Sequence, residues 1–312
     1  MSIRPLSPAL QKVAVEELNE DPKRIESDLA DFKAWIEQQP HLKARTTDQF
    51  LIAFLRGCKY SLEKAKLKLD NYYALKEKYP DFLKRPNFDD EKFRKLLKMG
   101  IILYLPTPLT ESGPRVVLVR NGAFDPSEFS FSEVAQYRQL MQDITLVEDD
   151  VAVVGGLVFI MDFADVSAAH LFQASPGAMR KVSQYSEQAI PLRIKASHFI
   201  DTPSGFEPVF NLIKPIMPEK IQKRMFVHGS KREELFKIIP KEILPEEYGG
   251  LNGSLQNLID KWEEKILSYR DYFKEDEQYG VDESLRIKEV EVTDTKSTDM
   301  GLVGSFRKLV VD

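Results

Sequence analysis

The chain has 312 residues, 43% of them hydrophobic and 30% charged, a composition typical of a folded globular protein with one large domain or two unequal ones. Its formal net charge of −5 gives no support to nucleic-acid binding, and its single cysteine, Cys58, excludes an internal disulfide. The longest mostly apolar run, residues 151–161, is too short to span a membrane, and the N-terminus has no apolar signal segment. We therefore expect a cytoplasmic protein.

Residues 1–98 are predicted to form a helical module, because apolar residues recur there at helical spacing between residues that begin and end helices. Asp21-Pro22 begins one helix and Pro40 ends it, whereas Thr47 begins the next and Gly57 closes it. Short connections between such amphipathic helices indicate that they pack as one small unit. The predicted helices cover about residues 21–40, 47–57, 61–79 and 91–98.

From residue 100 onward, short apolar runs of strand character alternate with helical patterns. Repeated strand–helix alternation predicts an α/β fold, with a mostly parallel sheet and crossover helices. The strands are predicted at about 115–120, 156–163, 193–200 and 224–228, and the helices at about 131–147, 176–188, 204–217, 232–239 and 255–273.

These patterns divide the chain into four parts. They are a helical N-terminal module (1–98), a sheet domain (99–252), a C-terminal helix (253–274) and a polar tail with an apolar end (275–312). The acidic and polar composition of the tail predicts a loosely held segment. Its apolar end, residues 303–311, is either a frayed terminus or docks back on the body, since exposed apolar side chains are unfavourable in water.

The helix predicted at 204–217 is short, very apolar and bracketed by prolines. Ser204 followed by Glu207 predicts a capping box at its start, and Pro218 ends it. Such a helix is either an ordinary core helix or a lid over an apolar cavity. The apolar stripe taken alone favours the core helix, because most such stripes face a protein core.

A search for catalytic motifs finds none in the sequence. The four histidines form no His-Glu-x-x-His zinc motif, and neither a Gly-x-Ser-x-Gly elbow nor a Gly-x-x-x-x-Gly-Lys loop occurs. Asp162 and Asp165 are either an acid/base pair or helix-capping residues, and His198 is either a base or a hydrogen-bonded core histidine. We therefore expect a binding protein without catalytic residues, metal or cofactor. An enzyme using these three residues is the alternative.

The segment 193–232 around the apolar helix carries eight basic residues and three acidic ones, although the whole chain is negative. Arg193 and Lys195 alternate along a predicted strand and so point to one face. Lys220 and Arg224, four positions apart, share a face if that segment is helical. Two basic pairs beside an apolar helix are either a solvated flank or a dock for clustered phosphates at an anionic membrane surface.

Several stretches resemble the CRAL-TRIO lipid-binding family. They are residues 190–206 (Ile-Pro-Leu-Arg-Ile-Lys-Ala-Ser-His-Phe-Ile-Asp-Thr-Pro-Ser-Gly-Phe), 213–221 and 244–250. Residues 48–65 resemble the helical N-terminal module of the same family, so the likeness extends over about residues 46–273. Within the family, the chain looks like an insect-like member of the α-tocopherol transfer protein and retinaldehyde-binding branch.

The resemblance implies a sheet floor with helices around an apolar pocket, closed by a mobile gate helix at about 204–217. It also implies that four basic residues bind phosphatidylinositol bisphosphate and trigger ligand exchange at the membrane. By motif position these are Arg193, Lys195, Lys220 and Arg224. The expected function is therefore that of a monomeric lipid-transfer protein, peripherally and reversibly associated with such membranes. A phosphoinositide-binding trafficking adaptor with an incidental pocket ligand is the alternative.

The ligand expected from the resemblance is tocopherol, a retinoid or a similar small hydrophobic molecule. Two departures from the family pattern bear on its identity. Asp165 stands where the family often has glycine, and Leu140 and Ile144 stand where this branch has hydroxyl side chains. They favour a ligand of less polar character, or one anchored elsewhere. The predicted pocket residues are Tyr137, Leu140, Met141, Ile144, Phe159, Met161, Ile194, Phe206, Val209, Phe210 and Ile213.

Overall fold

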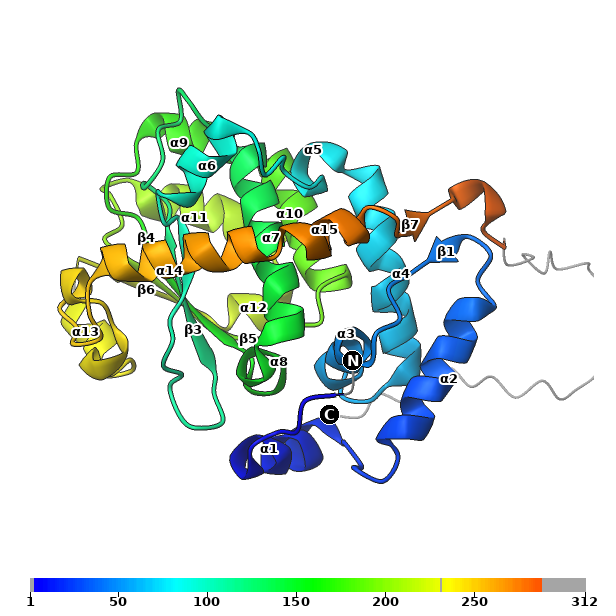
Figure 1. Cartoon of the computed structure of the whole chain (residues 1–312). Coiled ribbons are helices and arrows are strands. Elements are labelled where there is room, and N and C mark those ends of the chain that lie inside the picture. Colours follow the sequence, from blue (N-terminus) through cyan, green and yellow to red (C-terminus); the bar gives the residue numbers. More distant parts are fainter. Residues whose placement is uncertain (1–2, 231, 288–312) are drawn as a thin grey trace, which may run out of the picture.

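The centre of the molecule is a five-stranded sheet with the order β2-β3-β4-β5-β6 (Figure 1). The computed structural model describes residues 3–230 and 232–287, without the side chains of Val209, Ile213 and Ile216. Strand β2 is antiparallel to β3, and the remaining neighbours are parallel. The prediction of an α/β fold with a mostly parallel sheet is confirmed. The strands are β2 (Ile102–Tyr104), β3 (Arg115–Arg120), β4 (Leu157–Asp162), β5 (Ile194–Ile200) and β6 (Met225–Gly229).

Each face of the sheet is buried in a different apolar cluster, because side chains alternate along a strand. Val117 and Phe159 belong to the cluster that also contains the helices α7 (Phe131–Glu148), α8 (Asp150–Gly155) and α10 (Pro176–Gln188). Val116 and Val158 belong to the other, which contains α13 (Arg232–Phe236) and α14 (Leu255–Ser268). Short helical segments complete this part of the chain: α9 (Ala168–Gln173), η2 (Lys241–Ile243) and η3 (Glu246–Tyr248).

The N-terminal region is helical as predicted, and two of its helices were not predicted. The expected helices correspond to α2 (Ile25–Glu37), α3 (Asp48–Gly57), α4 (Leu62–Lys78) and α6 (Glu91–Leu97). The additional ones are α1 (Pro8–Leu18) and the single turn α5 (Pro80–Leu83). Helix α1 begins at Ser7, whose side chain accepts a hydrogen bond from the Leu10 N–H, and its apolar residues pack against Val154 of α8.

The apolar run 151–161 is divided between a helix and a strand, and the helix α8 was not predicted. Gly156 separates them with a φ of +85°, a conformation that side chains rarely adopt. A Cβ atom at this position would lie 2.7 Å from the carbonyl oxygen of Arg193, so glycine also permits the close approach of β5. A continuous apolar run therefore concealed a change of secondary structure at one residue.

The segment predicted as one helix at 204–217 consists of α11 (Phe206–Ile213) followed by the 3₁₀ turn η1 (Lys214–Ile216). The predicted capping box is wrong: Gly205, with a φ of +86°, precedes the helix, and no side chain caps it. Helix α12 (Glu219–Gln222) comes next. Pro215 and Pro218 lack an N–H and cannot continue a helical ladder, which explains why the segment is broken.

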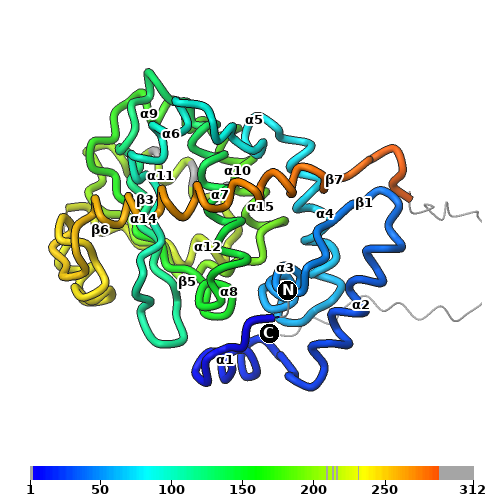
Figure 2. The backbone as a smooth tube through the Cα atoms, in the orientation of Figure 1, coloured from blue at the N-terminus to red at the C-terminus, as the bar shows by residue number. Residues whose placement is uncertain are grey.

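The C-terminal part returns to the N-terminal helices. The single predicted helix is divided into α14 and α15 (Arg270–Asp276), which run across the molecule in Figure 1. Strand β7 (Gly280–Val281) then pairs with β1 (Leu42–Lys43), as Figure 2 shows where the orange segment lies beside the blue one. A turn, η4 (Glu283–Leu285), leads to Arg286, which forms an ion pair of 2.5 Å with Asp70.

The expectation of a loosely held tail is therefore wrong for residues 275–287. Its polar composition misled the prediction because several of its charged residues are paired with the N-terminal region, such as Asp276 with Arg45 and Arg286 with Asp70. The predicted apolar end, residues 303–311, lies outside the described residues. In the parts of the chain that the structure describes, no helix has the length and apolar character needed to cross a bilayer. The four-part division of the chain stays a prediction.

Candidate functional site

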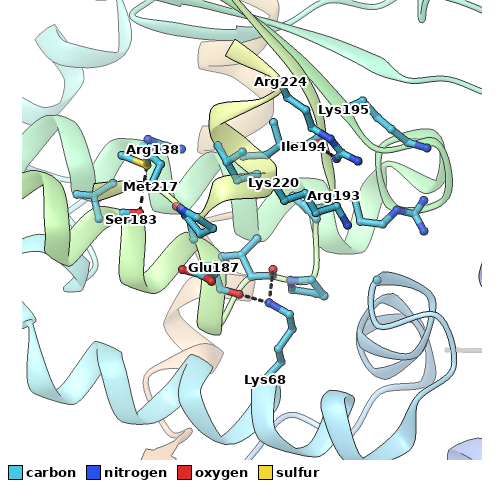
Figure 3. Close-up of a pocket in the computed structure, with 18 of the residues that line it drawn as sticks. Lys68, Arg138, Ser183, Glu187, Arg193, Ile194, Lys195, Met217, Lys220 and Arg224 are labelled. Carbon is cyan, nitrogen blue, oxygen red and sulfur yellow. Dashed lines mark hydrogen bonds between the residues drawn. The ribbon is translucent and has the colours of Figure 1, made fainter. Parts of the chain in front are cut away.

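A cavity of about 330 Å³ lies where the start of β5, the end of η1, α10 and α12 meet α3 and α4 of the N-terminal region (Figure 3). Its walls are partly apolar, with Val182, Ile194 and Met217 among them. The charged part of the wall is strongly unbalanced, because Glu17 and Glu187 are its acidic members. Its basic members are Lys59, Lys68, Arg138, Arg193, Lys195, Lys220 and Arg224.

All four residues predicted to bind phosphoinositide line this one cavity. Arg193 and Lys195 lie on either side of Ile194, the first residue of β5. Lys220 is on α12, whereas Arg224 lies beyond the end of that helix and its carbonyl oxygen accepts a hydrogen bond from the Ser197 N–H, 2.8 Å away. The two basic pairs therefore converge on one cavity. Lys220 and Arg224 do not share a helix face, which we expected only if the whole segment were helical.

The N-terminal region reaches this cavity through a close contact at Gly57. A Cβ atom there would lie 1.9 Å from the carbonyl oxygen of Pro191, so only glycine allows the end of α3 to approach the segment before β5. Lys59, two residues after Gly57, also lines the cavity. Lys68 of α4 donates hydrogen bonds to the carbonyl oxygens of Glu187 and Ile190. Sequence reasoning did not predict these two lysines as site residues, because they are far from residue 193 in the chain.

The basic side chains of the cavity are poorly neutralised. Arg193 donates one hydrogen bond to the carbonyl oxygen of Val154, and its Nε and Nη1 atoms are buried without a partner. Arg224 donates to the carbonyl oxygen of Ile194. Lys195 alone of the four predicted residues forms an ion pair with a carboxylate, 3.2 Å from Glu17, within the described part of the chain.

The pKa values of the site reflect its surplus of positive charge. Partial burial lowers the pKa of Lys220, and neighbouring positive charges lower it further. Those charges belong to Arg224, Lys59, Arg193 and Lys195. Burial likewise lowers the pKa of Arg193 and of Lys68. Cations that destabilise one another in this way would all be stabilised by a multiply charged anion.

The predicted apolar pocket residues lie elsewhere. Of those whose side chains the structure describes, Ile194 lines the cavity. Tyr137, Leu140, Met141 and Ile144 are buried in the main apolar core, as are Phe159 and, at its margin, Met161. Tyr137 donates a hydrogen bond to the carbonyl oxygen of Ile102, 3.2 Å away. Whether these residues line a ligand site stays a prediction, and the side chains of Val209 and Ile213 lie outside the described residues.

The helix predicted to be a gate packs its described aromatic side chains on the sheet domain. Phe206 is 5% exposed and lies 4.7 Å, centroid to centroid, from Phe163. Phe210 stacks on Phe206 at 5.4 Å and meets Phe199 at 5.1 Å. Leu212 on the same helix is 67% exposed. This packing suits a closed gate and equally suits a core helix, so the two interpretations stay open.

Two of the three residues of the alternative enzyme, Asp162 and His198, are held by structural partners, whereas Asp165 has no hydrogen bond or ion pair within the described residues. Asp162 accepts hydrogen bonds from the Ala164 N–H at 2.8 Å and from the Tyr248 hydroxyl. His198 is 2% exposed, and its Nδ1 lies 2.9 Å from Nε2 of His228. Burial first, and then His228, lowers the pKa of His198 to about 4. Within the described residues, no hydrogen bond joins Asp162 to His198, and no His, Cys, Asp or Glu cluster suits a metal.

Comparison with known proteins gives the family. A family model described as "CRAL/TRIO domain" matches residues 98–250, and one described as "Pinta-like, UBA domain" matches residues 21–98. A human protein named alpha-tocopherol transfer protein-like is 30% identical over 261 residues, which are 83% of this chain and 75% of that protein. The chain belongs to the CRAL-TRIO family.

Two further matches of this CRAL-TRIO protein are to a clavesin and to a solved structure. Human clavesin-2 is 27% identical over 288 residues, 92% of this chain and 86% of that protein. The crystal structure of Sfh5 matches with a TM-score of 0.49 and 13% identity, over 87% of this chain and all of that one, a likeness too weak to support an inference. The resemblance to the CRAL-TRIO family and to its tocopherol-transfer-like branch is confirmed. The protein is accordingly a lipid-binding or lipid-transfer protein.

Proposed function

We propose that this CRAL-TRIO protein carries one small hydrophobic ligand, such as tocopherol, a retinoid or a similar molecule, and exchanges it at membranes that contain phosphatidylinositol bisphosphate. The ligand is held under the segment 204–217, and the membrane headgroup docks at Arg193, Lys195, Lys220 and Arg224. The protein performs no covalent chemistry. It works as a cytoplasmic monomer that associates peripherally and reversibly with the membrane.

The observation that supports the docking proposal most directly is the shared cavity of these four basic residues. Burial first, and then repulsion by neighbouring cations that include the other three, lowers the pKa of Lys220. A bisphosphorylated headgroup brings several negative charges and many acceptor oxygens, so it relieves this repulsion and fills unused donors such as Nε and Nη1 of Arg193. A neutral headgroup offers neither advantage.

The position of the cavity suggests how headgroup binding is coupled to ligand release. Met217 and Pro218, which follow η1, are part of its wall, and Lys220 is on the next helix. A headgroup that draws α12 toward Arg193 therefore acts on the chain directly after α11. The short, proline-interrupted connection between the two helices passes that displacement to α11. Phe206 and Phe210 would then leave their aromatic partners.

The docking proposal predicts that Lys220→Ala combined with Arg224→Ala weakens binding to vesicles containing phosphatidylinositol bisphosphate. Each basic residue at an anionic surface contributes about 1 kcal/mol, so the pair should reduce affinity roughly thirtyfold. Vesicle sedimentation measures this loss, and ligand capacity should stay intact. Lys223→Ala with Lys237→Ala removes the same charge from exposed lysines paired with Glu219 and Glu234, and serves as the control. Equal vesicle binding by both double variants would refute the docking proposal.

The trafficking adaptor is the second candidate, and the aromatic packing of α11 is compatible with it as well as with a closed gate. If Phe206 and Phe210 never leave Phe163 and Phe199, the helix is part of the core and any ligand is incidental. Native mass spectrometry of the protein extracted from its own cells separates the candidates. A stoichiometric hydrophobic ligand supports transfer, whereas ligand-free protein that still binds bisphosphoinositide vesicles supports the adaptor.

A further inference from the structure

Arg138 is a cation without a partner at the apolar end of the cavity. It is the only basic residue of α7, and within residues 3–230 and 232–287 no hydrogen bond or ion pair engages its guanidinium group. Figure 3 shows it beside Met217 and Ser183, on the opposite side of the cavity from Arg193, Lys195 and Arg224. An arginine stays protonated in a protein, so an anion would stabilise this half-buried positive charge.

A second, smaller cavity adjoins this position and also contains unpaired polar atoms. Its volume is about 10 Å³, and it shares Arg138, Val182 and Ser186 with the larger cavity. Tyr185 and Gln139 form part of its wall, and each is 2% exposed. The Tyr185 hydroxyl and Gln139 Oε1 are buried without a hydrogen-bond partner, a rare and unfavourable state. Unpaired polar groups on two helices therefore share the wall of this smaller cavity with Arg138.

The electrostatics of Arg138 resemble those of Arg193 and Lys68, whose pKa values are also lowered by burial. Burial lowers the pKa of Arg138, which is the expected response of a cation removed from water. The surrounding wall is mostly apolar, with Met179, Val182 and Met217 next to the polar Ser183. A single water molecule in the smaller cavity could satisfy Tyr185 and Gln139, but water does not neutralise a guanidinium group.

We propose that the transported ligand is a hydrophobic molecule with one acidic group, a carboxylate, which Arg138 binds with the Tyr185 hydroxyl as a second donor. This inference rests on the proposed transfer function and specifies the class of its ligand. The apolar walls formed by Met179, Val182 and Met217 receive the start of the ligand's tail. The guanidinium fork suits a carboxylate because it donates two parallel hydrogen bonds.

The test compares two ligands that differ only in the acidic group. Oleic acid and oleyl alcohol are titrated into the delipidated full-length protein in competition with a neutral fluorescent lipid, and retinoic acid with retinol forms a second pair. Wild-type protein should bind each acid roughly ten- to a hundredfold more tightly than its alcohol. This factor corresponds to the net stabilisation that hydrogen bonds to a charged group provide. Arg138→Met should abolish that preference and leave alcohol binding unchanged.

Further variants separate a ligand contact from a structural effect. Arg138→Lys keeps the charge and should retain part of the preference, whereas Tyr185→Phe should reduce it by a smaller factor. Arg180→Met removes an exposed arginine of α10 that does not line the cavity, and it should change nothing. Because Arg138 has no partner to lose, Arg138→Met should melt at the wild-type temperature. If that variant does not fold, the lysine and phenylalanine variants still decide the proposal.

Three outcomes would overturn the inference. Equal binding of acid and alcohol by wild-type protein excludes an acidic ligand but leaves the transfer function standing. A preference for acid that persists in Arg138→Met, or that disappears in Lys220→Ala with Arg224→Ala, places the carboxylate at another group. Binding of neither acid nor alcohol, together with no ligand in the protein from its own cells, rejects the transfer function itself.

Discussion

Two clusters of charged side chains show how differently this molecule uses positive charge. In the first cluster, Arg85 lies between Asp143 of α7 and Asp276 of α15 and forms ion pairs with both. Tyr72 of α4 donates a further hydrogen bond to Asp143 over 2.7 Å. Burial alone would lower the pKa of Arg85, but the two carboxylates raise it well above its usual range. Carboxylates of the protein thus neutralise Arg85, and the cluster ties the N-terminal helices to the sheet domain and to α15.

The basic cavity around Lys220 is the opposite case. Its cations converge without enough carboxylates, and the pKa of Lys220 falls instead of rising. Both clusters contain arginine and lysine drawn from segments distant in the chain. The difference between them is whether the protein itself supplies the anions. A neutralised cluster is part of the fold, whereas an unneutralised one indicates a binding site for an anion that the protein does not contain.

The largest effect expected from this comparison is that of Arg85→Met. The substitution leaves Asp143 and Asp276 buried with their main partner removed, so the free energy of unfolding should fall by about 3–5 kcal/mol. Urea denaturation measures the change. Arg24→Met, which removes an exposed arginine paired with Asp28 at 3.0 Å, is the control and should cost about 0.5 kcal/mol or less. Similar losses for both variants would show that the Arg85 cluster does not hold the fold together.

A smaller effect is expected at Lys76, the least satisfied member of that cluster. Its Nζ lies 3.6 Å from Asp143, and burial followed by Arg85 lowers the pKa of Lys76 to about 8. Because this folded-state pKa is below the unfolded value of about 10.4, the unfolded chain binds the extra proton between the two values. Stability should therefore rise with pH from about 8 to 10.4, by on the order of 3 kcal/mol at most.

Lys76→Met should remove this rise, and at neutral pH it should cost much less than Arg85→Met. Unfolding curves for the variant and the wild type across this pH range give the difference, in which the tyrosines common to both proteins cancel. Parallel pH profiles of the unfolding free energy for the two proteins would mean that the folded state stabilises the Lys76 ammonium as well as it stabilises the Arg85 guanidinium. The Arg85 cluster would then be uniformly satisfied.

The sequence was sufficient for the parts of the fold that depend on local patterns. Strand β3 and helix α10 were predicted to the residue, because a short, mostly β-branched apolar run before Asn-Gly and a Ser-Pro helix start define them within a few positions. The break after α8 depends on the close approach of Gly156 to Arg193, and the ordered segment at 275–287 depends on pairing with β1 and Asp70. Such long-range contacts leave no periodic signal.

The candidate site, like the fold, was only partly predictable from the sequence. The four basic residues were found because charge is visible in a sequence and because the family resemblance gave their positions. Lys59, Lys68 and Arg138 were missed, since they reach the cavity only through the packing of α3, α4 and α7. Leu140 and Ile144 show the opposite difficulty, because both were predicted to line the pocket from an apolar helical pattern and the family resemblance. An apolar helix face looks the same in a sequence whether it lines a pocket or lies in a packed core, and both side chains are buried among other apolar residues.

The smallest effect on stability is expected at Lys220. Because this side chain makes no ion pair or hydrogen bond within the described residues and is repelled by its neighbours, Lys220→Met should change the free energy of unfolding by no more than about 0.5 kcal/mol. Soluble inositol trisphosphate, the headgroup of phosphatidylinositol bisphosphate, should stabilise wild-type protein by about 2.7 kcal/mol at a hundred times its dissociation constant. At the same concentration the variant should gain clearly less.

Thermal unfolding with and without inositol trisphosphate measures both quantities in one experiment. Lys223→Met is the matched control, because Lys223 is exposed like Lys220 and lies on the same segment, but it is paired with Glu219 at 2.7 Å and does not line the cavity. Added salt should reduce the stabilisation by the headgroup, since screening weakens the attraction between charges. A loss of more than about 1 kcal/mol on Lys220→Met, with full headgroup stabilisation retained, would place Lys220 with Arg85 among the structural cations. The contrast between the two clusters would then be lost.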